Sequence, residues 1–287
     1  MLQKTALGSK SSLEAEQTCR AAVSADRPKY QRDGYLLARG LLLPDALKAL
    51  IAEVTDLFDR PLQETIPFDS PAIWCWRHRP DGRRSIFRLS ESRTIHALAT
   101  GALHESCRTL ADTEFLQLFE CVIFQKPAGI GEQFAWHNDQ SYYPTDPGNS
   151  ISIWIALDVC DDETGALRFA KGSHRHRSVV PVDVKTGKPM AGSLEQELAD
   201  PEKAGYETEM LPMNPGDGVF FDANAWHASP PNRSRNRQRR GICFRFWTEP
   251  TRYAPGPGKQ AMFTRQLKAE PGALIDGPCF PIFDAAR

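Results

Sequence analysis

The sequence lacks the features that hold disulfide-rich or membrane proteins together. Its seven cysteines are an odd number, and no two of them form a C-x-x-C pair. A disulfide framework and a cysteine-built zinc site are therefore both disfavoured, and a reducing compartment is expected. No stretch approaches the roughly 20 apolar residues of a membrane helix, and the N-terminal residues lack the apolar centre of a signal peptide. These absences predict a soluble, cytoplasmic protein.

An excess of charge of one sign is also absent. The 35 basic and 36 acidic side chains leave a formal net charge of −1 across 287 residues. This balance gives no general attraction to nucleic acid or to an anionic membrane. A chain of this length with 41% hydrophobic residues can bury a large core without covalent staples. We therefore expect a globular protein that is not a dedicated nucleic-acid or membrane binder, and no oligomeric state is implied.

Patterning along the chain predicts a short polar arm followed by one domain. Residues 1–28 have little apolar periodicity and are expected to form a flexible arm. In the remaining domain, residues 29–287, the segment 34–39 is typical of a strand. Apolar residues at three- and four-residue steps predict a helix that begins at Pro44, and a second helix is expected over 94–109.

After the helices, the chain changes to short β-type segments separated by Gly and Pro. The expected strands are Leu118–Gln125, Phe134–Asp139, Ser150–Asp158, Ala166–Ala170, Gly218–Asp222 and Gly241–Thr248. Helices followed by many short strands predict a mainly β protein with flanking helices, a double-stranded β-helix (jelly-roll, cupin-like) core. The polar interval 181–210 is expected to be a surface insertion or a lid.

Two motifs indicate a metal site. Side chains two apart on a strand point the same way, so His137 and Asp139 of Trp-His-Asn-Asp can bind one ion. A histidine hydrogen-bonded at a strand end is the alternative for this motif alone. His227 follows the apolar strand 218–222, and at the rim of a barrel it would face the first pair. Two histidines and one carboxylate, with three coordination positions open, are typical of non-haem Fe(II) oxygenases.

An arginine-rich run precedes the last predicted strand and offers an anchor for a dicarboxylate. The planar fork of arginine forms two parallel charge-assisted bonds with a carboxylate, as the far end of 2-oxoglutarate requires. Strand alternation puts Arg239, Gly241, Cys243 and Arg245 on one face and the apolar residues on the other. Arg239 is therefore the predicted anchor, and Arg240 is the alternative if the register is shifted by one residue.

These motifs, together with others in the same order, resemble the phytanoyl-CoA dioxygenase family of Fe(II)/2-oxoglutarate oxygenases. The similarity covers about residues 30–250. The matching segments are Tyr30–Leu36, Phe124–Pro127, Trp136–Pro144, Ile153–Asp158, Glu163–Arg168, Gly172–His174, Pro215–Asp217, His227–Asn232 and Arg239–Ile242.

The resemblance implies an enzyme and assigns roles to its residues. His137, Asp139 and His227 would be the iron ligands, and Arg239 would hold 2-oxoglutarate. Gln125 and Trp154 match family positions that line the cosubstrate pocket. The implied reaction consumes 2-oxoglutarate and O2, releases succinate and CO2, and hydroxylates an aliphatic C–H bond of a small metabolite. A carboxylate at position 139 favours hydroxylation over halogenation, whereas desaturation or cyclisation in secondary metabolism stays an alternative.

Residues that contact the substrate are harder to assign. Tyr142 and Tyr143 follow the metal motif and could stack on a substrate, although packing explains them equally well. The basic segment 77–93 is either a solvated loop or a lid, in which Arg88 would bind an anionic substrate group. Arg245 would then be a second internal cation for the same anion.

Two other classes of protein remain to be tested against this prediction. A non-catalytic cupin-like binding protein could keep the fold, but it would not need the complete metal triad together with Arg239. A nucleic-acid demethylase uses the same metal ligands but needs a basic groove, which the balanced charge disfavours.

Overall fold

The computed structural model describes residues 26–59, 74–75, 86–87, 93–129, 133–176, 200–256, 270–276 and 282. The helices are α2 (Arg27–Asp33), α3 (Pro44–Asp59), α4 (Arg93–Thr100) and α5 (Ala102–Ala111), with 3-10 turns η2 (Gln140–Tyr142) and η3 (Ser173–Arg175). None of the helices in these described ranges combines the length and the apolar character needed to cross a membrane.

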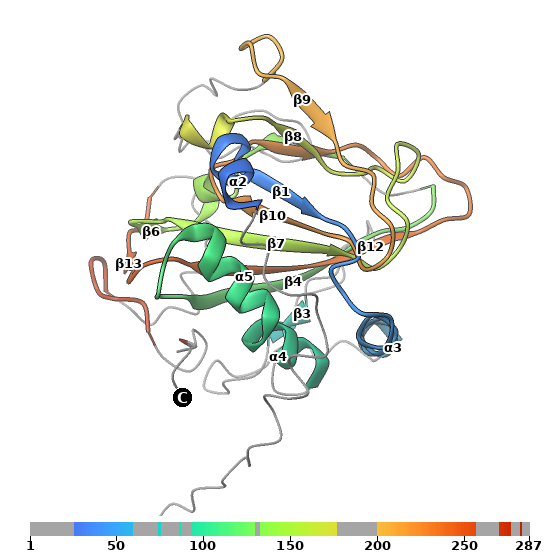
Figure 1. Cartoon of the computed structure of the whole chain (residues 1–287), viewed down its shortest axis with the longest axis horizontal. Coiled ribbons are helices and arrows are strands. Elements are labelled where there is room, and N and C mark those ends of the chain that lie inside the picture. The colour runs from blue at the N-terminus through green and yellow to red at the C-terminus, as the bar shows by residue number, and fades with distance from the viewer. Residues whose placement is uncertain are drawn as a thin grey trace, which may run out of the picture.

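Most of the strands form two antiparallel sheets (Figure 1). The larger sheet has the order β1 (Tyr35–Ala38), β10 (Gly218–Asp222), β7 (Ser150–Ala156), β12 (Arg239–Trp247), β4 (Gln117–Lys126). The smaller sheet has the order β5 (Phe134–His137), β11 (His227–Ser229), β8 (Arg168–Ala170), β9 (Thr208–Met210). Two short pairs join β6 (Thr145–Asp146) to β13 (Arg252–Tyr253) and β2 (Trp74–Cys75) to β3 (Ile86–Phe87).

The predicted elements are present, with one correction. A strand occurs in every predicted β segment, and α3 begins at Pro44 as expected. The helix predicted over 94–109 is instead two helices, α4 and α5. They are separated at Gly101, whose backbone dihedral angles (φ −103°, ψ −135°) are not helical. Glycine is a poor helix former, so a break between the two apolar segments at this position is physically reasonable.

Three sequence predictions concern segments that are largely outside the described residues. Of the predicted arm 1–28, only residues 26–28 are described, and helix α2 begins there. Of the predicted insertion 181–210, residues 200–210 are described and include β9. Of the basic segment 77–93, the described residues are 86, 87 and 93.

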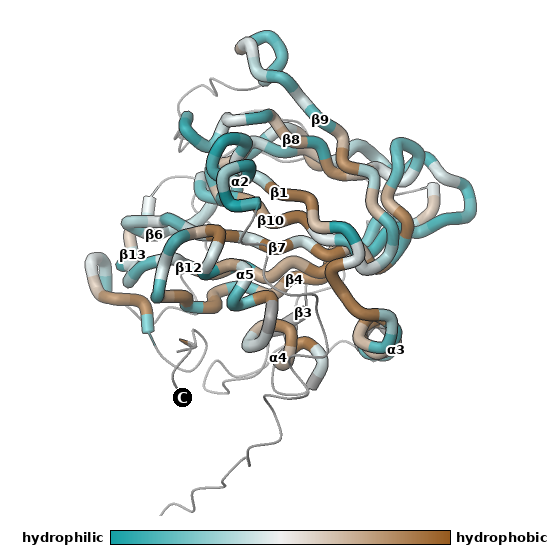
Figure 2. Tube along the Cα trace, viewed as in Figure 1, coloured by the Kyte–Doolittle hydropathy of each residue, from teal (hydrophilic) through white to brown (hydrophobic). Residues whose placement is uncertain are grey.

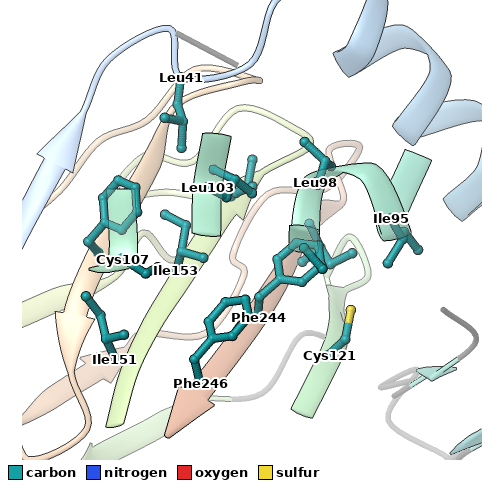
Figure 3. Packing of buried hydrophobic residues seen from close by; sticks show 14 of the residues in the cluster. Leu41, Ile95, Leu98, Leu103, Cys107, Cys121, Ile151, Ile153, Phe244 and Phe246 are labelled. Atoms are coloured by element: carbon teal, nitrogen blue, oxygen red, sulfur yellow. The ribbon is translucent and has the colours of Figure 1, made fainter. Parts of the chain in front are cut away.

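The larger sheet has an apolar outer face that the helices cover. Phe244 and Phe246 of β12 belong to the same buried cluster as Leu98 of α4 and Leu103 of α5 (Figure 3). Burying each phenylalanine side chain contributes about 1.5–3 kcal/mol. The prediction that the apolar face of this strand packs under helices is therefore confirmed, and the opposite face of β12 is directed toward the smaller sheet.

A second apolar cluster lies between the two sheets. The ring of Tyr35 in β1 stacks on that of Phe169 in β8, with 4.7 Å between their centroids. The hydropathy colouring shows apolar residues along the central strands and hydrophilic residues in the connecting loops (Figure 2). The polar side chains described below lie beside this cluster, in the interior between the sheets.

Candidate metal centre

Three buried side chains with metal-binding atoms converge between the two sheets. His137, Asp139 and His227 each offer one ligand atom, and these atoms lie within 4.8 Å of one another. The Nε2 atoms of the two histidines are 3.9 Å and 3.8 Å from Oδ1 of Asp139. Two imidazoles and one carboxylate suit non-haem Fe(II), with positions left for other ligands. The donor set and its spacing therefore fit a single ferrous ion.

Strand pairing brings the two histidines together. His137 ends β5 and His227 begins β11, and the two residues are directly opposite in the antiparallel register. Opposite residues in such a pair point to the same side of the sheet. Their rings are consequently close, with 4.3 Å between the centroids. His227 faces the His-x-Asp motif, as the sequence predicted.

The third ligand reaches the site by a different route from the one predicted. Strand β5 ends at His137, and Asp139 has a helical backbone conformation (φ −68°, ψ −36°) just before η2. A turn, and not strand alternation, therefore aims its carboxylate at the histidines. The buried turn is held by hydrogen bonds from the Ser141 amide to Asn138 Oδ1 (2.9 Å) and from the Gln140 amide to the Ala223 carbonyl (3.1 Å).

Backbone carbonyls orient both imidazoles. Nδ1 of His137 lies 2.6 Å from the carbonyl oxygen of Ala135, and Nδ1 of His227 lies 2.9 Å from that of Ala225. An Nδ1–H that donates to a carbonyl leaves Nε2 as the lone-pair atom for a metal. Burial, reinforced by the neighbouring His227, lowers the pKa of His137 to about 3, and burial also lowers the pKa of His227. Both rings are therefore neutral at pH 7, the form that binds metal.

The two oxygens of the Asp139 carboxylate have different surroundings. Oδ1 faces the imidazoles, whereas Oδ2 accepts a hydrogen bond from Nε of Arg245 at 2.9 Å and forms an ion pair with Nη2 at the same distance. Burial by itself would raise the pKa of Asp139, but Arg245 and the two histidines outweigh it and lower this pKa. The carboxylate is therefore charged and ready to bind a cation through Oδ1.

A second polar centre lies on the same face of β12 at its other end. The Arg239 guanidinium is buried 4.7 Å above the Trp154 ring, and its Nη2 donates to Ser229 Oγ at 3.2 Å. Lys126, directly opposite Arg239 on β4, donates to the same Oγ at 2.6 Å. Among the described residues no carboxylate forms an ion pair with Arg239, and its Nε has no hydrogen-bond partner. Burial lowers the pKa of this guanidinium, and an incoming anion would relieve that cost.

Arg240 and Gln125 lie on the opposite face of these strands. Arg240 forms a two-pronged ion pair with Asp158 (2.9 and 3.0 Å) and donates to Thr55 Oγ1 at 3.0 Å. Gln125 is its cross-strand partner and donates to Gln238 at 3.1 Å. The structure therefore does not bring Gln125 to Arg239, because alternation turns it away. Trp154, in contrast, is in contact with Arg239.

Of the residues predicted to contact the substrate, one lies against a metal ligand and two contact carboxylates of the protein. The Tyr142 ring is edge-on to that of His137, with 5.8 Å between centroids. Tyr143 instead donates to Glu120 at 2.8 Å, and Arg245 donates to both Asp139 and Glu120. The donors of Arg245 are therefore directed at protein carboxylates and not at a substrate position. Arg88 lies outside the described residues.

Sequence reasoning did not single out three residues of this region. Ser229 is two residues after His227, and Lys126 follows Gln125, so alternation from the correct register would have indicated both. Glu120 leaves no comparable signal, because only the pairing of β4 with β12 places it opposite Arg245.

The chain belongs to the phytanoyl-CoA dioxygenase (PhyH) family, whose model matches residues 30–241. Among curated relatives, the methylphosphonate hydroxylase of Gimesia maris is 30% identical over 172 residues, which are 57% of this chain and 61% of that protein. The ectoine dioxygenase of Bordetella bronchiseptica is 26% identical over 231 residues, 74% of this chain and 72% of that protein. The chain thus spans about three fifths of the first relative and nearly three quarters of the second.

Solved structures share the fold. The epimerase SnoN from nogalamycin biosynthesis, in complex with Fe3+, alpha-ketoglutarate and nogalamycin RO, has a TM-score of 0.67 at 21% identity, covering 89% of this chain and 96% of that one. EctD from S. alaskensis, with 2-oxoglutarate and 5-hydroxyectoine, has a TM-score of 0.65 at 20% identity, covering 86% and 85%.

These similarities confirm the predicted family and the jelly-roll core. The prediction of an iron- and 2-oxoglutarate-dependent dioxygenase is likewise confirmed at the level of the family. The cofactors of that chemistry are Fe(II), 2-oxoglutarate and O2, and the triad of described ligands fits the iron.

Proposed function

We propose that this member of the family hydroxylates an aliphatic C–H bond of a small metabolite, with release of succinate and CO2. His137, Asp139 and His227 hold Fe(II), and Arg239 holds the far carboxylate of 2-oxoglutarate. The observation that carries this proposal is the convergence of the three ligand atoms within 4.8 Å, in the interior that also contains the buried Arg239. Bound iron would supply the oxidising chemistry, and the protein supplies the positions of the reactants.

The region around Arg239 supports its role as the cosubstrate anchor. A buried guanidinium is costly unless an anion is bound to it. Arg239 has its Nη2 on Ser229, its face on Trp154, and an Nε without a partner among the described residues. Lys126 adds positive potential from the opposite strand. A dicarboxylate such as 2-oxoglutarate would supply the negative charge that Arg239 lacks among the described residues.

Two relatives indicate which substrates to test first. One is named a methylphosphonate hydroxylase, and another, 29% identical over 119 residues, a probable alpha-ketoglutarate-dependent hypophosphite dioxygenase of Stutzerimonas stutzeri. We infer that small anionic compounds, alkylphosphonates above all, belong at the head of a substrate panel. Ectoine, a zwitterion, follows from the second relative.

Succinate formation tests the proposal. The purified protein, incubated with Fe(II), 2-oxoglutarate and O2, should release succinate, and faster when a panel member is a substrate. Mass spectrometry of the product separates the chemistries, because hydroxylation adds one oxygen atom whereas desaturation or ring closure removes two hydrogens. His227→Ala and Asp139→Ala should lose at least about 100-fold in succinate formation and in affinity for Co(II), since each removes a ligand.

His174→Ala is the matched control. His174 lies in the same half of the chain, but its Nε2 faces the carbonyl of Gln31 at 3.2 Å and it is not part of the metal cluster. The control should keep Co(II) affinity and succinate formation within about twofold. Equal losses of Co(II) affinity and succinate formation in all three variants would contradict the proposal. So would the absence of succinate from the wild-type protein with every panel member.

A further inference from the structure

We propose that Arg245 and Glu120 are positioning residues of the iron site. Arg245 holds Asp139 so that only Oδ1 is presented to the metal, and Glu120 holds Arg245. This inference rests on the proposed function, because it takes Asp139 to be an iron ligand. It assigns to Arg245 a role in the metal site in place of the substrate contact expected from the sequence.

The contact between Arg245 and Asp139 occupies one carboxylate oxygen. Nε and Nη2 of the guanidinium both lie 2.9 Å from Oδ2, while Oδ1 is directed to His137 and His227. A charge-assisted hydrogen bond, with a second guanidinium nitrogen in ion-pair contact with the same oxygen, is strong and directional. The carboxylate is thereby restrained against rotating to bind iron through both oxygens. Three coordination positions then stay open for 2-oxoglutarate and O2.

Glu120 completes the network on the far side of Arg245. Nη1 of Arg245 donates to Glu120 Oε2 at 2.8 Å, and the Tyr143 hydroxyl donates to the same oxygen at 2.8 Å. Glu120 and Arg245 are directly opposite in the β4–β12 register. A fixed strand pairing therefore sets the position of the guanidinium, and the guanidinium in turn sets that of Asp139.

The network also joins the two sheets. Arg245 belongs to the larger sheet, whereas Asp139 follows β5 of the smaller sheet. All four side chains are buried, so their hydrogen bonds compete little with water. The same strand carries a second ion pair, between the buried Arg240 and the half-buried Asp158, which points to the other face and does not touch a metal ligand. This pair offers a matched control.

The test compares two double variants that each remove one ion pair of β12. Arg245→Met with Glu120→Gln removes both charges and keeps at position 120 an amide oxygen that can accept from Tyr143. Arg240→Met with Asp158→Asn removes both charges of the other ion pair, on the opposite face of β12, and keeps an amide oxygen at position 158. Co(II) affinity is measured by calorimetry. The charge-transfer absorption of the anaerobic Fe(II)–2-oxoglutarate complex reports how strongly Asp139 donates electrons to iron.

The Arg245/Glu120 variant should bind Co(II) 10- to 100-fold more weakly, as expected when an outer partner of a ligand is lost. Its charge-transfer maximum should move to longer wavelength, because Asp139 donates more strongly once Oδ2 loses the hydrogen bond and the positive charge of Arg245. The Arg240/Asp158 variant should keep its affinity within about threefold and its maximum at the wild-type wavelength. If the first double variant does not fold, Arg245→Lys replaces it. This variant keeps the positive charge but loses the planar guanidinium, and its charge-transfer maximum should move to longer wavelength by a smaller amount.

Failure of this inference and failure of the proposed function give different results. A wild-type protein that binds Co(II) and forms succinate, with an Arg245/Glu120 variant unchanged in affinity and spectrum, would overturn only this inference. Equal losses of Co(II) affinity in the two double variants would also overturn it, because they would show a general effect of removing an ion pair from β12. A wild-type protein that binds no metal would instead overturn the proposed function.

Discussion

Two arginines lie on the same face of β12, six residues apart, in opposite electrostatic situations. Arg245 donates to the carboxylates of Asp139 and Glu120. Arg239 contacts the hydroxyl of Ser229 and the ring of Trp154, and it forms no ion pair within the described part of the chain. Both guanidinium groups are buried.

The difference between these arginines separates a built-in ion pair from a binding site. Moving a charge into the protein interior is costly unless a partner of opposite charge accompanies it. Arg245 has that partner within the fold, so its role is internal. Arg239 lacks one, and the dianion 2-oxoglutarate would supply it. Both residues are buried arginines, and their roles differ only because a carboxylate of the protein lies beside Arg245 and none lies beside Arg239 among the described residues.

Removing the unpaired cation should have the largest effect. In Arg239→Met, the affinity for 2-oxoglutarate should fall by roughly 100-fold or more, because a lost buried charge pair costs about 2–5 kcal/mol. Arg239→Lys should recover part of the loss, since a lysine keeps the charge but not the fork. Calorimetric titration of the Co(II)-loaded protein with 2-oxoglutarate measures the change directly.

Arg240→Met is the control for this prediction. It removes the same type of side chain from the neighbouring residue and breaks the pair with Asp158. The control should be less stable, yet its affinity for 2-oxoglutarate should stay within about threefold of wild type. A larger loss in Arg240→Met than in Arg239→Met would mean that the anchor lies on the other face of the strand.

A pH titration of the free energy of unfolding tests the metal site, which lies at the Arg245 end of β12. The pKa of His137 is about 3 in the folded protein, against about 6.5 in an unfolded chain. Between these pH values the unfolded chain binds more protons, so stability falls as the pH falls. Each such histidine contributes about 1.4 kcal/mol per pH unit, and the lowered pKa of His227 adds in the same direction. Urea unfolding of the metal-free protein between pH 6.5 and 4.5 measures the slope.

The contribution of His137 is obtained by difference. Burial raises the pKa of Glu120, which acts in the opposite direction, and Asp139, whose pKa is lowered, acts only below about pH 4. The contribution of Glu120 is common to wild type and His137→Gln, and that of Asp139 lies below the titrated range, so the difference between the two slopes isolates the imidazole. Parallel slopes would show that His137 titrates normally in the folded state.

The two faces of β12 could be predicted because they depend on local periodicity. The apolar face of β12 and the inward position of Arg239 both follow from a period of two. The facing of His227 toward His137 was expected from the position of His227 after an apolar strand, and the pairing of β11 with β5 produces it. The face of Gln125 could not be predicted from its family position alone, because that position does not give its pairing and a shift of one residue changes the face.

The turn at Asp139 and the pairing of Arg245 with Glu120 could not be predicted from the sequence, because both depend on non-local contacts. The end of β5 at His137 is fixed by hydrogen bonds within the buried turn and to Ala223, which is distant in the chain. The pairing of Arg245 with Glu120 depends on a strand register across 125 residues. Non-local contacts of this kind leave no periodic signal in either segment.

The smallest effect expected at the Arg239 end comes from adding one methyl group. A Cβ at Gly241 would lie 1.9 Å from Cζ2 of Trp154, so Gly241→Ala must displace the ring that supports Arg239. Affinity for 2-oxoglutarate should fall about tenfold, which is about 1.4 kcal/mol. Gly218→Ala is the control, because its Cβ meets the end of the Leu41 side chain in the outer cluster. It should lower stability by about 1–3 kcal/mol with 2-oxoglutarate affinity unchanged. Equal affinity in the two alanine variants would mean that Trp154 does not position Arg239.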